Sequence, residues 1–193
     1  MNKNKGLILV SLIIIGLCTA CGNNLTNEVN TQSQSQKVKE PSKSEVAYNK
    51  FINIAMGSSY DQVKAELGTE GSLTHENSIG NTKTQSYHFT IGDAHISMTF
   101  SNGALTNKSI ASLAFLNDHN TKINLDQFNK IQSGMSYDQV REIMESDGHL
   151  SSQTQLMGHR SSLYTWMGPG ASNVVVTFDT NNTVNSKTQF GLK

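Results

Sequence analysis

Apolar and polar positions follow helical spacing and then strict alternation, and they do so twice along the chain. The stretches "FINIAMGSSYDQV" at 51–63 and "FNKIQSGMSYDQV" at 128–140 share eight identities in thirteen positions at a constant offset of 77. Such self-similarity is the sequence signature of a structural repeat. The two halves of the chain are therefore predicted to fold into the same unit.

Each copy of the shared phrase predicts a helix, a glycine turn and a second helix. In the first copy, Tyr48, Phe51 and Ile54 recur at the spacing of one helical face. Gly57 breaks that helix, and Gly134 stands at the same place in the second copy.

The second helix of each pair begins with a capping signal. Ser59 and Ser136 stand where an N-cap belongs, each with a glutamine three residues later. Second helices are expected over about 60–67 and 137–145, ending near Gly68 and Gly148. An acidic residue in the first helical turn, as Asp61 and Asp138 are, stabilises the helix dipole, so we interpret both as structural rather than catalytic.

After each helix pair the pattern alternates with the period of a strand. "QSYHFTI" and "HISMTF" flank Gly92-Asp93, a two-residue turn with glycine in the first position of a type II′ turn. If Ile91 pairs with Ala94, Phe89 faces Ile96 on one side of the hairpin. On the other side the register places polar residues together, namely His88, Thr90, His95, Ser97 and Thr99. A last strand follows near 104–112.

The second half repeats this order with "SSLYTWM", "NVVVTF" and "TVNSKTQFGL", and with a longer loop at 168–172. Trp166 lies in mid-strand, and a core position is favoured over a ligand platform. The expected fold is α+β: two tandem α-α-β-β-β-β repeats, with helices on one face of an antiparallel sheet and a concave open face opposite.

The N-terminus has the features of an export signal. Lys3 and Lys5 precede the apolar run "GLILVSLIIIGL", and "CTAC" follows. The run is shorter than the roughly 20 residues of a membrane-spanning helix. Cys21 after Thr19-Ala20 resembles a bacterial lipobox, which implies acylation, including by palmitate, and an anchor on the extracytoplasmic face of the cell membrane.

The two cysteines, Cys18 and Cys21, then leave no thiol in the mature domain. We therefore expect no disulfide, thiolate metal site or cysteine nucleophile there. The whole chain has 15 basic and 15 acidic residues. Loss of Lys3 and Lys5 with the signal peptide leaves 15 − 2 = 13 basic against 15 acidic residues, a net charge of −2 for the mature protein. No basic stripe indicates nucleic-acid binding.

The stretch "GNNLTNEVNTQSQSQKVKEPSKSEV" is too poor in apolar residues to form a core and is expected to be a flexible tether. The expected division is a lipoprotein signal peptide at 1–20, a lipid-anchored tether at 21–46, a first repeat at 47–115 and a second at 116–193.

The repeats resemble the β-lactamase inhibitor protein family of exported bacterial proteins. The resemblance rests on a "FxxIxxGM[ST]xxxV" phrase and on the closing "VTFDTNNTVNSKTQFGL". It implies two tandem α-α-β-β-β-β repeats with a concave eight-stranded sheet. The same half-unit also resembles the small outer-membrane lipoproteins of the barrel-assembly machinery.

In the inhibitor family, the resemblance implies, the aspartate of the first-repeat "G-D" turn enters the lactamase active site. Gly92-Asp93 occupies that place, so Asp93 is either a partner anchor or an ordinary turn residue. The predicted partner-binding residues are Gly92, Asp93, His88, Thr90, His95 and Ser97. The family's aromatic-rich face and its disulfides have no counterpart in this sequence.

Catalytic and metal-binding motifs are not evident. The histidines, which are His75, His88, His95, His119, His149 and His159, form no HExxH pattern, and no GxSxG elbow occurs. His88 and His95 are expected to be diagonal neighbours, which leaves a weak transition-metal contact open beside a solvated polar face. We expect no enzyme activity, no cofactor and no small-molecule substrate.

Three functions remain open. The first is a lipid-anchored module that binds a protein partner of the cell envelope through the open sheet and its loops. The second is an inhibitor of a β-lactamase or penicillin-binding enzyme. The third is a structural or assembly lipoprotein of the envelope.

Overall fold

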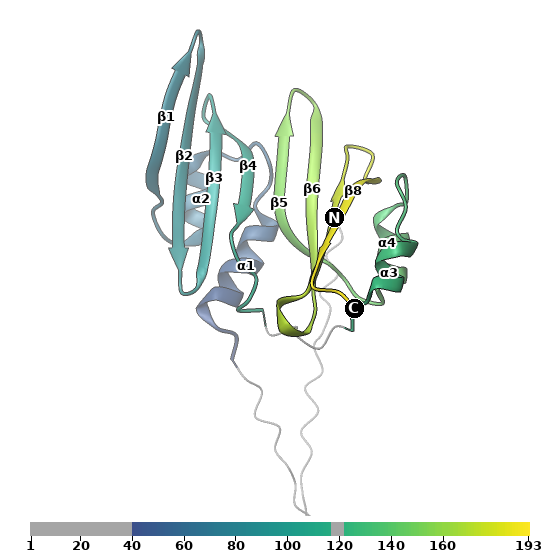
Figure 1. The fold of residues 1–193 in the computed structure, drawn as a ribbon. Helices are drawn as coiled ribbons and strands as arrows, with labels where there is room; N and C mark the ends of the chain where they lie inside the picture. Colours follow the sequence, from purple (N-terminus) through teal and green to yellow (C-terminus); the bar gives the residue numbers. More distant parts are fainter. Residues whose placement is uncertain (1–39, 117–121) are drawn as a thin grey trace, which may run out of the picture. The chain divides into compact units, whose positions relative to one another are not determined.

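Eight strands in sequence order form one antiparallel sheet, from β1 at one edge to β8 at the other (Figure 1). This computed structural model describes residues 40–116 and 122–193, all within the unit Lys39–Lys193. The α+β prediction with two tandem α-α-β-β-β-β repeats is confirmed within these residues.

Each repeat contributes a pair of helices and four strands. The first contains α1 (Lys43–Asn53), α2 (Tyr60–Leu67), β1 (Ser72–Ile79), β2 (Thr82–Ile91), β3 (Ala94–Ser101) and β4 (Ala104–Ile110). The second contains α3 (Leu125–Lys130), α4 (Tyr137–Met144), β5 (His149–Leu156), β6 (His159–Met167), a short 3-10 turn at Pro169–Ala171, β7 (Asn173–Phe178) and β8 (Val184–Phe190).

The predicted caps form in both repeats. Ser59 and Ser136 each accept a hydrogen bond from the main-chain N–H three residues on, and the glutamine side chain at that position accepts one in return. Gly68 ends α2 in the left-handed conformation, as expected. The repeated phrase therefore encodes the start of a helix.

Three boundaries differ from the sequence-based expectation. Helix α1 begins at Lys43 with Ser42 as its cap, inside the segment expected to be tether, because Ser42 and Glu45 form a capping box. Strand β4 ends at Ile110 rather than near 112. Helix α4 ends at Met144, with Glu145 in the left-handed conformation, so Gly148 is not its stop.

Gly148 has a different role, shared with Gly71 at the same place in the first repeat. A Cβ atom on Gly148 would lie 2.7 Å from the Trp166 ring, and one on Gly71 would lie 2.7 Å from the Phe89 ring. Both glycines therefore let a large aromatic side chain pack directly against the main chain.

Both cores lie on the helix-covered face of the sheet. The first gathers Phe51, Val63, Phe89, Ile96 and Met98 around α1 and α2, and the second gathers Ile131, Val140, Trp166, Val174 and Phe178 around α3 and α4. Trp166 is buried and donates its indole N–H to the main-chain oxygen of Ser146 at 2.9 Å, so its predicted core position is confirmed.

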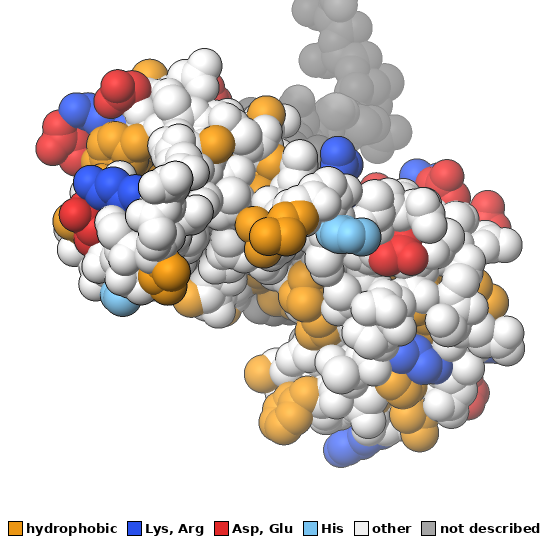
Figure 2. Space-filling view, turned by 90° about the horizontal axis from the view of Figure 1, so that it is seen from above, with side chains coloured by type: hydrophobic (Ala, Val, Ile, Leu, Met, Phe, Trp, Pro, Cys, Tyr) orange, Lys and Arg blue, Asp and Glu red, His pale blue; other side chains and the backbone are white. Residues whose placement is uncertain are grey.

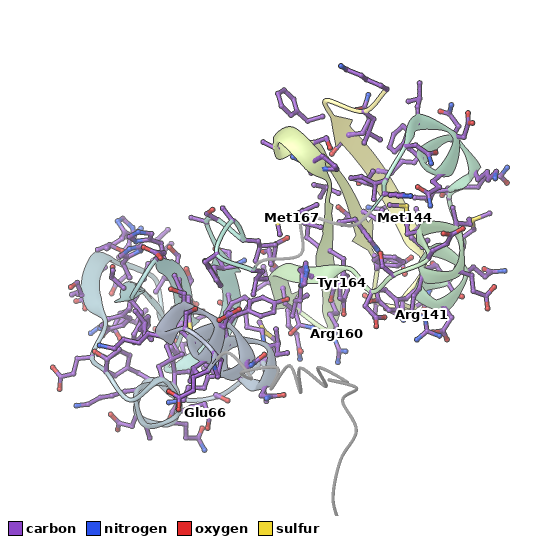
Figure 3. The ribbon with its side chains drawn as sticks, turned by 90° about the horizontal axis from the view of Figure 1, so that it is seen from below. Glu66, Arg141, Met144, Arg160, Tyr164 and Met167 are labelled. Carbon is purple, nitrogen blue, oxygen red and sulfur yellow. The ribbon has the colours of Figure 1, made fainter. Side chains whose placement is uncertain are left out.

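Tyr164 on β6 packs against both cores. Figure 3 labels it on β6, between the helices of the first repeat and those of the second. Burial raises the pKa of its hydroxyl above the ordinary value. Tyr164 therefore packs between the two repeats, which are also joined by the β4–β5 strand pair.

A buried lysine on β4 binds the carbonyl groups at the C-terminal end of α1. Lys108 on β4 is 1% exposed and donates to the main-chain oxygens of Phe51, Ile52 and Ile54. Lys187 on β8 repeats the arrangement by donating to Phe128 at 2.6 Å. Each ammonium also lies over the ring of the phenylalanine whose carbonyl it binds.

Candidate protein-binding site

The β2–β3 hairpin has the register that the sequence predicted. Phe89 pairs with Ile96 and Tyr87 with Met98, while Thr90 pairs with His95 and His88 with Ser97. Phe89, Ile96 and Met98 are buried, whereas Thr90, His95 and Ser97 are exposed. The polar side of the hairpin therefore forms part of the open face, defined here as the side of the sheet opposite the two cores.

The Gly92-Asp93 turn is fixed to the first helix. Gly92 has a φ of +59°, as the first position of a type II′ turn requires. The N–H of Asp93 donates to the hydroxyl of buried Ser44 at 2.8 Å, and a Cβ on Gly92 would approach that hydroxyl to 2.6 Å. The turn is thus attached to α1 through its main chain, while the Asp93 side chain is exposed.

The two predicted histidines of the hairpin do lie together. Their rings are stacked with centroids 5.6 Å apart, and Nδ1 of His95 lies 3.4 Å from Nε2 of His88. The hydroxyls of Ser97 and Thr90 lie 3.4 and 3.5 Å from Nδ1 of His88 and of His95, respectively. The imidazoles and hydroxyls thus form a polar cluster that can donate or accept hydrogen bonds.

Small polar side chains continue the open face across the sheet. Ser86 and Thr99 share a hydrogen bond of 2.9 Å within the first repeat, and Ser151 and Thr165 share one of 3.0 Å within the second. Asn107 donates to Thr154 at 2.8 Å across the β4–β5 junction. The junction is narrow, because β4 pairs with β5 only through 107–109 and 152–154.

A pocket of about 530 Å³ lies beside this junction, and sequence reasoning missed it. The chain after β4 forms one side, with Leu113 and Ala114, and β6 forms another, with Leu163 in mid-strand and Met167 at its end. The loop that contains Gly168 closes it, and that loop was expected to belong to the binding surface. The sequence signal that could have indicated this pocket is the two-residue alternation along β6, which places Leu163 and Met167 on the face opposite buried Trp166.

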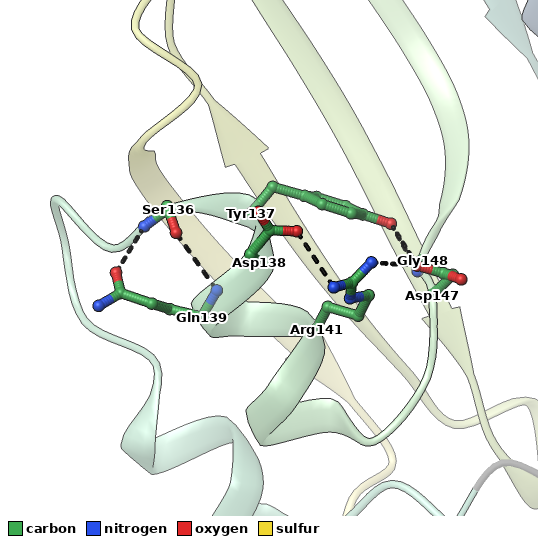
Figure 4. Close-up of polar contacts among 7 residues, drawn as sticks. All are labelled: Ser136, Tyr137, Asp138, Gln139, Arg141, Asp147 and Gly148. Carbon is green, nitrogen blue, oxygen red and sulfur yellow. Dashed lines mark hydrogen bonds and ion pairs between the residues drawn. The ribbon is translucent and has the colours of Figure 1, made fainter.

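The acidic residues of the repeated phrase, Asp61 and Asp138, lie in the first turns of α2 and α4, where a negative charge stabilises the helix dipole. Figure 4 shows Arg141 between Asp138, at 3.3 Å, and Asp147, at 3.9 Å, on the exposed surface. The hydroxyl of Tyr137 accepts a hydrogen bond from the N–H of Gly148 at 3.2 Å, and burial raises the pKa of this tyrosine to about 12. Tyr60 accepts from Gly71 in the same way at 3.1 Å. The tyrosine that recurs in the two repeats thus joins helix to sheet in each.

The outer surface carries no dense charge of one sign in the view of Figure 2, where red and blue side chains lie scattered among uncharged ones. Hydrophobic side chains are in small separate groups there. Among the large hydrophobic side chains of the described residues, Met157 is the most exposed, at 91%, and it follows Leu156 at the β5–β6 turn. This distribution does not suggest a nucleic-acid surface.

Within the described ranges, 40–116 and 122–193, no three His, Cys, Asp or Glu side chains are grouped as a metal site would need. All helices in that part of the chain are too short or too polar to cross a membrane. Cys21, the predicted lipidation residue, and His119 lie outside the described residues.

An antiparallel sheet with helices on one face and an open polar face on the other defines a scaffold suited to binding another macromolecule. The model of the β-lactamase inhibitor family, "Beta-lactamase inhibitor (BLIP)", matches residues 47–166, and this chain belongs to that family. The family is one of protein-binding inhibitors rather than catalysts, which agrees with the fold and site.

The structural comparison supports the same fold. A crystal structure from Streptococcus mutans, described as that of a candidate β-lactamase inhibitor protein, superposes with a TM-score of 0.60 at 20% sequence identity. The match covers 76% of this chain and 94% of that one. No curated protein matches the sequence.

Proposed function

We propose that this chain is a lipid-anchored, non-catalytic module of the cell envelope that binds a protein partner through the open face of its sheet. The observation that carries the proposal is the sheet itself: both helix pairs pack on one side, and within the described residues no α-helix lies on the other. Membership of an inhibitor family supports a protein as the partner.

The hairpin of β2 and β3 is the proposed centre of the contact in the first repeat. Its turn is held to α1 through Ser44, so Asp93 and His95 are presented without a large ordering cost. Asp93, Gly92, His88, Thr90, His95 and Ser97 are the residues we assign to partner binding. Anchoring through Cys21 would place this face at the extracytoplasmic side of the membrane, at the end of the tether.

Site-specific photo-crosslinking tests the proposal. A photoreactive side chain at position 95 samples the open face, and one at position 142, an exposed site on α4, samples the helix side. The full chain is expressed with either substitution in intact cells and irradiated. We expect one specific protein adduct from position 95, reduced by Asp93→Ala, and none from position 142.

Adducts from position 142 alone, or undiminished adducts from position 95 in the Asp93→Ala chain, would contradict the open-face model. The first result would move the contact to the helices and favour a structural or assembly role.

Inhibition of a β-lactamase or penicillin-binding enzyme is the second candidate, and the family match favours it. The Gly92-Asp93 turn is hydrogen-bonded to α1 and its carboxylate is exposed, as an anchor in an active site requires. The test is hydrolysis of a chromogenic cephalosporin by purified β-lactamase with increasing protein. Inhibition that Asp93→Ala weakens at least about tenfold would support this function, and unchanged hydrolysis at saturating protein would exclude that enzyme as the target.

A further inference from the structure

The strand pair that joins the two repeats has a second, unused copy of each of its members. β4, the last strand of the first repeat, pairs with β5, the first strand of the second. β8 and β1 are the corresponding last and first strands, and they form the two edges of the sheet (Figure 1). Within the described residues, neither has a partner strand on its outer side.

β8 repeats the environment of β4. Near the start of each strand, a residue accepts a main-chain hydrogen bond from the glycine turn of its own helix pair, from Gly57 to Leu105 at 2.8 Å and from Gly134 to Val184 at 2.9 Å. Three positions later, Lys108 and Lys187 each donate to a carbonyl of the first helix of their own repeat. The residues of β4 that pair with β5, 107–109, therefore have their equivalents at 186–188 of β8.

β1 repeats β5 at the offset of 77. Both strands have a bulge in their pairing with the next strand, at Thr74 and at Ser151, and both hydroxyls donate to a carbonyl of that strand, at 3.0 and 3.1 Å. In β5 the bulge does not prevent residues 152–154 from pairing with β4. The equivalent residues of β1, 75–77, are exposed, so β1 has the same shape and a free edge.

The register of the β4–β5 junction, applied to the free edges, brings complementary side chains together. The junction pairs are Asn107–Thr154, Lys108–Gln153 and Ser109–Ser152, and their equivalents are Ser186–Asn77, Lys187–Glu76 and Thr188–His75. Lys187 thus stands opposite Glu76, and opposite charges stabilise a cross-strand pair. Asn77 stands opposite Ser186, an amide and a hydroxyl like those that share a hydrogen bond of 2.8 Å at the junction.

Apolar surface that is buried at the junction is exposed at the free edges. Leu150 of β5 packs into the first core and is 8% exposed, whereas its equivalent on β1, Leu73, is 51% exposed. Tyr48 of α1 lies against the first residue of β5 and is buried. Its equivalent in the second repeat, Leu125, is 39% exposed. The second repeat therefore has the surface on which a strand like β5 packs, without such a strand.

We propose that copies of this chain associate head to tail, with β1 of one copy added to β8 of the next in the register of the β4–β5 junction. The contact joins two different edges, so each assembly keeps one free edge of either kind and its growth is open-ended. A contact of three residue pairs is small, so it forms chiefly where copies are concentrated, as on a membrane that anchors them. It uses the sheet edges and is independent of the function proposed for the open face.

Cysteine cross-linking tests this on the full chain in its own membranes. One copy carries Asn77→Cys and one epitope tag, and a second copy in the same cells carries Ser186→Cys and another tag. A short bismaleimide is added to isolated membranes, and adducts that carry both tags are measured. We expect a mixed dimer. A chain with both substitutions should give a ladder of dimers, trimers and larger products, because the two edges of one sheet are about 34 Å apart, at about 4.8 Å for each strand spacing.

Two controls calibrate the yield. Asn107→Cys with Thr154→Cys in one chain should link within that chain, because these side chains are in contact at the junction. Glu66→Cys in one copy with Glu142→Cys in the other places both thiols on exposed helical sites, and should give at least about tenfold less mixed dimer. Chains without an added cysteine give the background from Cys18 and Cys21.

Charge reversal tests the register. Glu76→Lys in the Asn77→Cys copy places two cations opposite each other and should lower the mixed dimer at least about threefold, and Lys187→Glu in the other copy should restore it. Glu70→Lys, an equal change of charge outside the edge, should have no effect. Emission from Trp166 reports whether each variant is folded.

Three results would overturn the inference. The first is a mixed dimer no more abundant than that of the helical control while the Asn107–Thr154 link forms. The second is an equal yield of dimers from Asn77→Cys copies alone, which would show two-fold pairing of β1 with itself. The third is a mixed dimer that Glu76→Lys leaves unchanged, which would show a contact in a different register.

Discussion

At the scale of the residue, the lysine that binds the C-terminal end of α1 illustrates how a charge is tolerated in this core. Lys108 is buried without a carboxylate partner, and burial lowers its pKa to about 8. The three carbonyl oxygens at the end of α1, the negative end of the helix dipole, compensate for lost hydration. Lys187 has a single carbonyl contact and is half-buried.

The two lysines form a matched pair for mutation. We expect Lys108→Met to lower the free energy of unfolding by about 2–4 kcal/mol, because several buried acceptors lose their donor. Lys187→Met should cost only about 0.5–1 kcal/mol. Urea denaturation followed by Trp166 emission measures both. A neutral or stabilising Lys108→Met would show instead that desolvation of the ammonium outweighs its hydrogen bonds.

The same lysine predicts a pH dependence. Its folded-state pKa lies below the ordinary 10.5, so between pH 8 and 10 the unfolded chain binds more protons than the folded one. The free energy of unfolding should therefore rise with pH in that window, by about 2 kcal/mol. Lys108→Met should lack this rise. Parallel slopes for the two proteins would contradict the assignment.

At the scale of the element, the repeated phrase acts through its caps and its tyrosines. Ser59 and Ser136 form the same reciprocal capping box, and Tyr60 and Tyr137 bind the glycines that precede β1 and β5. These contacts fix the second helix of each pair to its own sheet. The identities in the sequence are therefore explained by local structure.

Removal of either cap should have the same effect in the two halves. Ser59→Ala and Ser136→Ala should each lower the free energy of unfolding by about 1 kcal/mol, since an N–H of the first turn loses its acceptor. Ser58→Ala, one position before the first cap, is the control and should change it little. Chemical denaturation of the three variants provides the comparison, and a large difference between the two caps would show that the repeats are not equivalent.

At the scale of the whole molecule, the sheet is continuous while its open face is not uniform. The β4–β5 pair and Tyr164 unite the repeats. The first repeat presents imidazoles and hydroxyls, and the second presents Leu163 and Met167 at a pocket. The same scaffold thus carries different side chains on the open face of its two repeats.

Membrane anchoring through a lipid on Cys21 is a prediction about the whole molecule. Cys21→Ser should abolish incorporation of radiolabelled palmitate and release the protein from the membrane fraction, because two or more acyl chains are needed for a stable anchor. Cys18→Ser, three residues earlier, should remain labelled. Label in the Cys21→Ser chain would place the lipid elsewhere.

The sequence by itself determined the repeat, the caps, the α+β order and the register of the β2–β3 hairpin. Each depends on local signals, such as a serine three residues before a glutamine or the two-residue period of a strand, which act over a few neighbouring positions. Only the tertiary structure showed the attachment of the Gly92-Asp93 turn to Ser44, the lysines at the helix ends and the junction pocket. These join residues far apart in the chain, through packing and hydrogen bonds that no local pattern encodes.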